Sequence, residues 1–223
     1  PMAMRGHSGE LEHPVDLEPN IAGGAPLSGS PHGALARLAI RAGAEPSPRN
    51  VVALLASRLV RLGLPPGEAA RLRGPAEIGA LRGVLPPDAL CDPAALVAAA
   101  REAAAGPRAH PSRKAISESD WGAIADLLTR LVAALAPLTA LAGEAPLPQW
   151  LAAHRAALGH LLADEDGASV FAGEDGARLA ALLDELDAAA DPALVFDASD
   201  YALFFDGLTS LAILRGPRRA HPR

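Results

Sequence analysis

The sequence contains few of the residues that carry catalysis or cross-link a chain. Among its 223 residues there is one cysteine, Cys91, and one lysine, Lys114. A single cysteine excludes an internal disulfide framework and a cysteine-rich metal or iron–sulfur site within the chain, and it fits a cytoplasmic location. The lysine lies in SRKAIS, without a neighbouring glycine and outside any Glu-x-Lys pattern. This excludes a Walker A phosphate loop and argues against a metal-dependent nuclease site.

Aromatic residues and long apolar runs are also scarce. Aromatics make up 3% of the chain, and the apolar half of the composition is mostly alanine and leucine, which favours helices over sheets. The longest apolar run, residues 131–142, is shorter than the ~20 residues of a membrane helix, and the first ten residues lack a signal-peptide pattern. We therefore predict an all-α fold and no membrane partner.

The charge balance argues against one class of protein. With 26 acidic and 20 basic residues the net charge is −6, unlike that of a generally basic nucleic-acid-binding module. The exception is the end of the chain, RGPRRAHPR. Its arginines could neutralise phosphates and are candidate DNA contacts, and the alternative is a solvated connection. These residues are Arg215, Arg218, Arg219 and Arg223.

Helix starts are the clearest local signals. The pairs Ser-Pro at 30–31, Ser-Pro at 47–48 and Asp-Pro at 92–93 each combine a capping side chain with proline at the first helical position. They predict helices from 31 to about 43, from 48 to Gly63 and from 93 to Gly106. Ser117 with Asp120 resembles a capping box and opens the strongest helical pattern of the chain.

The second half of the chain continues with helical patterns. They lie in QWLAAHRAALGHLL, GARLAALLDELDAAA and, from about Ser199, DYALFFDGLTSLAIL. Trp121 and Trp150 fall on apolar faces and are predicted to anchor the core. Val195 and Phe196 could form a short extended piece, and LAIL could end a helix or begin a strand. We divide the chain into a loop segment (1–30), a short-helix region (31–106), a linker (107–116), a helical bundle region (117–214) and a basic connection (215–223).

The acidic run ADEDGASVFAGEDG invites a metal interpretation, because Asp164, Asp166, Glu174 and Asp175 offer oxygen ligands. A calcium-binding loop needs glycine at its sixth position, and Gly167 is at the fourth. We favour a solvated loop in which Glu174 and Asp175 stabilise the start of the next helix through its dipole. A small helical enzyme that binds a metal with this loop is an alternative.

Histidine and cysteine give no catalytic pattern. His154 and His160 are six residues apart, whereas two metal ligands on one helix face prefer a spacing of three or four. We expect both histidines at the surface or partly buried. Cys91 stands at a helix entrance without evident partners, and G-x-S-x-G is absent, so we expect a structural cysteine and assign no catalytic, cofactor-binding or metal-binding residue.

Several segments in order resemble one known family. They are HPVDLEPNIAGGAPLSGSPHGALARLA, SESDWGAIADLLTRLVAALAPL, LPQWLAAHRAALGHLLADEDGASVFAGEDGARLAALLDEL, ASDYALFFDGL and RRAHPR. Across about residues 11–223 their order and spacing are similar to an internal stretch of the AddB subunit, in its alphaproteobacterial form. AddB belongs to the AddAB-type bacterial helicase–nuclease that repairs DNA double-strand breaks.

The resemblance implies an internal, non-catalytic fragment that contributes scaffold and contacts DNA or a partner. In that family an ATP-site-like part precedes such a segment, and the nuclease domain with its iron–sulfur cysteines follows it. ATP, magnesium and the iron–sulfur cluster would therefore belong to other parts of the parent protein. The implied partners are DNA and an AddA-type subunit. The alternative is a stand-alone helical protein–protein interaction module without DNA affinity.

Overall fold

Helices account for almost all of the regular structure. The computed structural model describes residues 24–83, 85–86, 89–141, 143–168 and 171–214. In these residues the strands are four pieces of two residues each, so the all-α prediction is confirmed. The helices are α1 (Pro31–Ala44), α2 (Pro48–Leu55), α3 (Glu68–Ala76), α4 (Pro93–Ala105), α5 (Pro111–Lys114), α6 (Glu118–Thr139), α7 (Leu147–Leu162), α8 (Gly173–Ala189) and α9 (Ala198–Leu211), with short helical turns η1 (Leu27–Gly29), η2 (Glu77–Leu81) and η3 (Ala89–Cys91).

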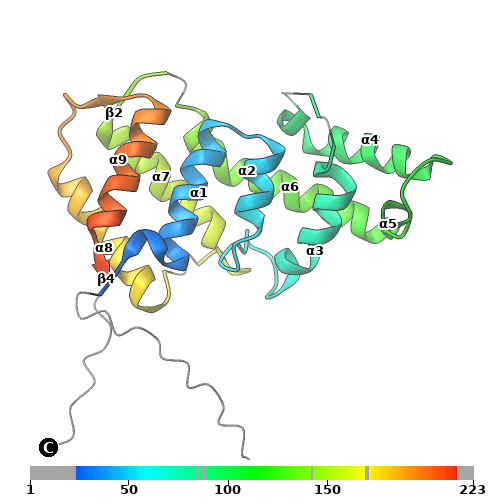
Figure 1. Ribbon diagram of the computed structural model, residues 1–223, viewed down its shortest axis with the longest axis horizontal. Coiled ribbons are helices and arrows are strands. Elements are labelled where there is room, and N and C mark those ends of the chain that lie inside the picture. The colour runs from blue at the N-terminus through cyan, green and yellow to red at the C-terminus, as the bar shows by residue number, and fades with distance from the viewer. Residues whose placement is uncertain (1–23, 84, 87–88, 142, 169–170, 215–223) are drawn as a thin grey trace, which may run out of the picture.

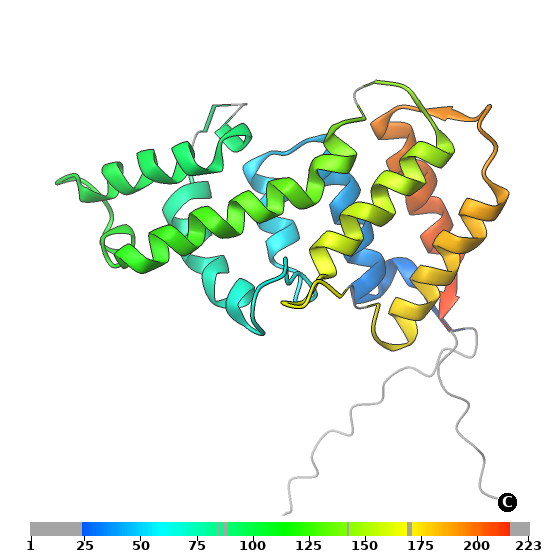
Figure 2. The ribbon, with the colours of Figure 1, turned by 180° about the vertical axis from the view of Figure 1, so that it is seen from behind.

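Helix α6 runs along the long axis of the molecule (Figures 1 and 2). It packs against α3 and α4 toward one end and against α1 and α7 toward the other. Ser117 caps it as predicted, because its hydroxyl accepts a hydrogen bond from the Asp120 amide at 3.1 Å. By length and composition alone α6 could also span a membrane. Here its apolar face lies in the core through Trp121, Ile124, Leu127, Leu128, Leu131, Ala134, Leu135 and Leu138.

Helix α1 joins the two regions of the chain. Ser30 caps its start as predicted, accepting a hydrogen bond from the Gly33 amide at 3.1 Å. The helix then packs against α2, α6, α7, α8 and α9. At Gly43 it crosses α6 so closely that a Cβ would lie 2.5 Å from Cβ of Leu138. The short-helix region and the bundle region therefore share one hydrophobic core.

Two pairs of short strands connect distant parts of the chain. Strand β1 (Ala25–Pro26) pairs antiparallel with β4 (Ile213–Leu214), and β2 (Ala145–Pro146) pairs antiparallel with β3 (Val195–Phe196). The extended piece predicted at 195–196 is confirmed, and LAIL divides between the end of α9 and β4. Because β1 and β4 begin and end the described chain, its two ends meet at one point (Figure 1).

One predicted helix is shorter than its pattern indicates. The pattern predicts a helix up to Gly63, but α2 ends at Leu55. The following segment folds onto α7 instead, where the backbone amides of Arg61 and Leu62 donate to the carbonyl of Leu161 at 2.8 and 3.3 Å. Leu62 adopts a positive φ of 58° there. By contrast, the predicted helix after residue 92 is confirmed as α4, and the segment 107–116 contains the single turn α5.

His154 was predicted at the surface or partly buried, and this is wrong: its exposed fraction is 0%. Its Nε2 lies 3.1 Å from the carbonyl oxygen of Ala36 on α1, and its Nδ1 lies 3.1 Å from the hydroxyl of Tyr201 on α9. A carbonyl oxygen only accepts, so Nε2–H donates to Ala36 and Nδ1 accepts from Tyr201. Burial lowers the pKa of His154 to about 4. The neutral ring thus links three helices.

His154 should make the fold less stable in mild acid. Its pKa is about 4 in the folded protein against an ordinary value of 6.5. Between these values the unfolded chain binds a proton that the folded protein does not, so stability falls as the pH drops. From pH 7 to pH 5 this residue should cost about 2 kcal/mol. Urea unfolding of the wild type and of His154→Leu at both pH values measures the difference, and equal pH dependence would contradict it.

Two glycines, Gly43 at the crossing of α1 and α6 and Gly122 at an exposed position of α6, allow a matched pair of substitutions. Gly43→Ala should destabilise the protein by about 2 kcal/mol, because the added methyl group overlaps Leu138. Gly122→Ala should stabilise it by about 1 kcal/mol, because alanine is the better helix former and a Cβ at Gly122 meets nothing within 4 Å. Thermal or urea unfolding measures both changes. Effects of the same sign would show that the two helices are not in close contact at Gly43.

Candidate nucleic-acid interface

Charge is distributed very unevenly along the chain. Residues 45–115, here called the basic half, contain ten basic and six acidic residues. Residues 116–214, the acidic half, contain three basic and sixteen acidic residues. The basic half ends in α4 and α5 at the right of Figure 1, whereas α8 and α9 of the acidic half lie at the left. The α8–α9 end is therefore strongly acidic. The α4–α5 end carries most of the cations, together with Glu118 and Asp120 at the start of α6, which pair with Arg101 and Arg71.

The ion pairs leave different charged groups unpaired in the two halves. All three basic side chains of the acidic half, Arg130, Arg155 and Arg178, pair with carboxylates of the same half. In the basic half, several exposed cations form no ion pair with a carboxylate in the described part of the chain. They are Arg49, Arg58, Arg61, Arg108 and Lys114.

Arg71 also belongs to the basic half, but it does form ion pairs. It bridges Glu68 and Asp120 at 2.8 and 2.6 Å. The hydrogen bonds from Arg71 hold the pKa of both carboxyl groups below their usual range. Its charge is thus neutralised by its neighbours, and Arg71 is not a candidate for contact with a ligand.

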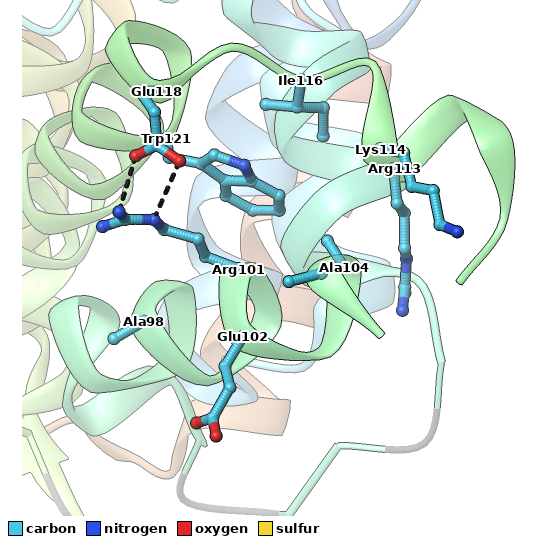
Figure 3. Close-up of a pocket in the computed structure, with 10 residues that line it drawn as sticks. Ala98, Arg101, Glu102, Ala104, Arg113, Lys114, Ile116, Glu118 and Trp121 are labelled. Carbon is cyan, nitrogen blue, oxygen red and sulfur yellow. Dashed lines mark hydrogen bonds and ion pairs between the residues drawn. The ribbon is translucent and has the colours of Figure 1, made fainter. Parts of the chain in front are cut away.

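An open groove lies where α4, α5 and α6 meet (Figure 3). It has a volume of about 580 Å³. Charged side chains from all three helices line it above an apolar base. The charged residues are Arg101, Glu102, Arg113, Lys114 and Glu118, and the base is formed by alanines with Ile116 and Trp121.

The three cations of the groove have different roles. Arg101 pairs with Glu118 at 2.7 Å (Figure 3). Arg113 is structural, because its Nε donates to the carbonyl of Ile78 at 2.9 Å and its Nη2 donates to the carbonyl of Arg82. Lys114 is exposed, and its Nζ has a long contact of 3.5 Å to the carbonyl of Pro107. Lys114 is therefore the cation of the groove that is best placed for an anionic ligand.

The groove suits binding better than catalysis. Exposed arginine and lysine side chains attract phosphate groups. Trp121 is only 4% exposed, so it anchors the core as predicted, like Trp150, and cannot stack on a base. Within the described residues, no three His, Cys, Asp or Glu side chains are grouped to hold a metal ion.

The candidate sites from the sequence fall in different places. Arg215, Arg218, Arg219 and Arg223 lie outside the described residues. Cys91 is exposed at the end of η3. His160 is exposed on α7, in agreement with its prediction.

The acidic segment behaves as a loop followed by a helix start. Asp164 Oδ1 accepts hydrogen bonds from the amides of Asp166 and Ala168 at 3.1 and 2.9 Å. Asp175 lies in the first turn of α8, where it accepts from the amide of His32 at 3.2 Å. Burial acts to raise the pKa of Asp175, but the hydrogen bonds from His32 hold it below its usual value. These carboxylates stabilise backbone turns and helix starts.

The basic half can be recognised in the sequence as a local excess of basic residues, although the net charge of the whole chain is negative. Counting charges by segment rather than over the whole chain reveals Arg108 and Lys114 in a basic stretch. Both residues lie in the segment 107–116, which was predicted to be a linker. No family model, curated protein or solved structure matches this chain. The functional proposal therefore rests on the arrangement of charges and on the family resemblance expected from the sequence.

Arg113→Lys should separate the structural role of Arg113 from its charge. Lysine keeps the positive charge but cannot bridge the carbonyls of Ile78 and Arg82, because it lacks the planar fork of donors. We expect a loss of about 1–2 kcal/mol in unfolding free energy and faster amide exchange in η2. Urea unfolding and hydrogen exchange measure both effects. Lys114→Gln is the control, and a loss of the same size in that variant would contradict the assignment.

Proposed function

We propose that this chain is a non-catalytic helical segment of a DNA double-strand-break repair helicase–nuclease subunit, and that its basic half contacts DNA. The observation that supports DNA contact is the set of exposed cations without carboxylate partners in the basic half. Arg108 and Lys114, close to the α4–α5–α6 groove, are the leading candidates. Contacts of this kind reach phosphates, so they bind DNA without reading its sequence.

The resemblance to AddB supports the repair part of the proposal. Two of the segments that carry it form α6 up to Leu138 and most of α9. The pairing of β1 with β4 fits an internal segment, because a unit whose ends lie together can be inserted into a longer chain. ATP, magnesium and iron–sulfur chemistry then belong to other parts of the subunit, and an AddA-type subunit in the cytoplasm is the partner.

A pair of charge-matched variants tests DNA contact. Arg108→Gln with Lys114→Gln removes two positive charges from the basic half. Arg155→Gln with Arg178→Gln removes two from the acidic half. The first variant should bind labelled single-stranded and duplex DNA about tenfold more weakly, and its salt slope should fall by about 2, one for each lost phosphate contact. Fluorescence anisotropy over a salt series measures both quantities.

The control variant should bind DNA as the wild type does. Equal losses in both variants would indicate that overall charge, rather than the basic half, governs binding. Absence of DNA binding by the wild-type chain would contradict the proposal and favour the stand-alone protein–protein interaction module.

A further inference from the structure

The markedly exposed large apolar side chains of the described residues lie in one stretch of the chain. Leu203 and Leu211 on α9 are 71% and 79% exposed. They stand on one face of the helix, four residues on either side of Gly207, where a Cβ would meet nothing within 4 Å. The side chains of Leu203 and Leu211 therefore flank a notch at Gly207. The other exposed large apolar side chains of the described residues are those of Leu194, Val195 and Ile213.

The segment just before α9 carries two more exposed apolar side chains. Leu194 and Val195 are about half exposed, at 49% and 50%. Strand β3 packs against α9, and the rings of Phe196 and Phe204 lie 5.1 Å apart. We call Leu194, Val195, Leu203, Gly207 and Leu211 together the α9 surface. Apolar surface of this kind next to polar residues is typical of a protein-binding site.

Three exposed carboxylates lie close in sequence to the Leu194–Leu203 part of the α9 surface. Asp191, Asp197 and Asp200 are exposed and lie within three residues of Leu194, Val195 or Leu203. None of the three forms an ion pair in the described part of the chain. Asp197 caps α9 by accepting from the amide of Asp200 at 2.8 Å.

In the described residues, the cations that contact α9 do not pair with these three carboxylates. Arg37 and Arg41 on α1 both pair with Asp206 on α9. The α9 surface therefore presents leucines in a negative field, and a ligand must satisfy both properties.

We propose that the α9 surface docks a basic amphipathic helix of a partner protein. Its apolar side chains would cover Leu203 and Leu211 and fill the notch at Gly207, as ridges pack into grooves between helices. Its flanking arginine or lysine side chains would face Asp191, Asp197 and Asp200. Charge complementarity selects this occupant, because an acidic helix would bring like charges together. The inference does not depend on DNA contact by the basic half.

Two synthetic amphipathic peptides provide the probes. They share the same leucine positions and differ only in carrying lysine or glutamate at the flanking positions. Isothermal titration should show binding of the lysine peptide to the wild-type chain and at least about tenfold weaker binding of the glutamate peptide, a difference of about 1.4 kcal/mol. No binding of the lysine peptide, or equal binding of both peptides, would overturn the proposal.

Leu203→Asp with Leu211→Asp separates docking from simple charge attraction. This variant gains two negative charges, so electrostatics alone predicts tighter binding of the lysine peptide. Docking on the leucines predicts at least about tenfold weaker binding. Ala133→Asp with Ala152→Asp adds the same charges at exposed positions of α6 and α7 and should bind at least as tightly as the wild type. Unchanged or tighter binding by the leucine variant would overturn the proposal.

Gly207→Gln gives an independent check without a change of charge. Glutamine favours the helix more than glycine does, so the variant should fold, and circular dichroism confirms this. Its side chain occupies the notch between the leucines and should weaken binding of the lysine peptide about tenfold. Binding as tight as that of the wild type would show that the peptide does not reach the notch.

Discussion

The close crossing of α1 and α6 is the contact on which the rest of the structure depends. Glycine at position 43 leaves room for Leu138, so the Leu138 side chain packs directly against the backbone of α1. Helix α1 packs against α2, α8 and α9, and α6 packs against α3 and α4. His154 adds a polar link from α7 to both α1 and α9. The positions of the charged halves follow from this arrangement.

The helix starts could be predicted from the sequence because capping is local. A serine or aspartate side chain bonds an amide three residues later, as at Ser30 and Ser117, whatever the rest of the chain does. The end of α2 could not be predicted, because its partner Leu161 is far along the chain. The burial of His154 depends on Ala36 and Tyr201 in the same way. Local capping hydrogen bonds determine where these helices begin, whereas contacts with distant residues determine where α2 ends.

The candidate interface was predictable only in outline. Counting charges by segment is enough to locate a basic half, but it treats all cations alike. Arg101, Arg113 and Lys114 are close in sequence, yet one is bound to a carboxylate, one to backbone carbonyls and one is available. These differences arise from the packing of α4, η2 and α6 around α5. Which cation can bind a phosphate is therefore a property of the fold.

In the proposed function, the uneven distribution of charge is what would allow a chain of net charge −6 to contact DNA. Electrostatic interactions in physiological salt fade over about 8 Å. Helix α6 has 22 residues and is about 33 Å long at 1.5 Å per residue, so carboxylates beyond its far end are screened from a phosphate near α5. A strand of DNA at Lys114 would therefore meet the local groups, which include Glu102 and Glu118 as well as the cations. The carboxylates of α8 and α9 at the far end would remain available for a basic partner.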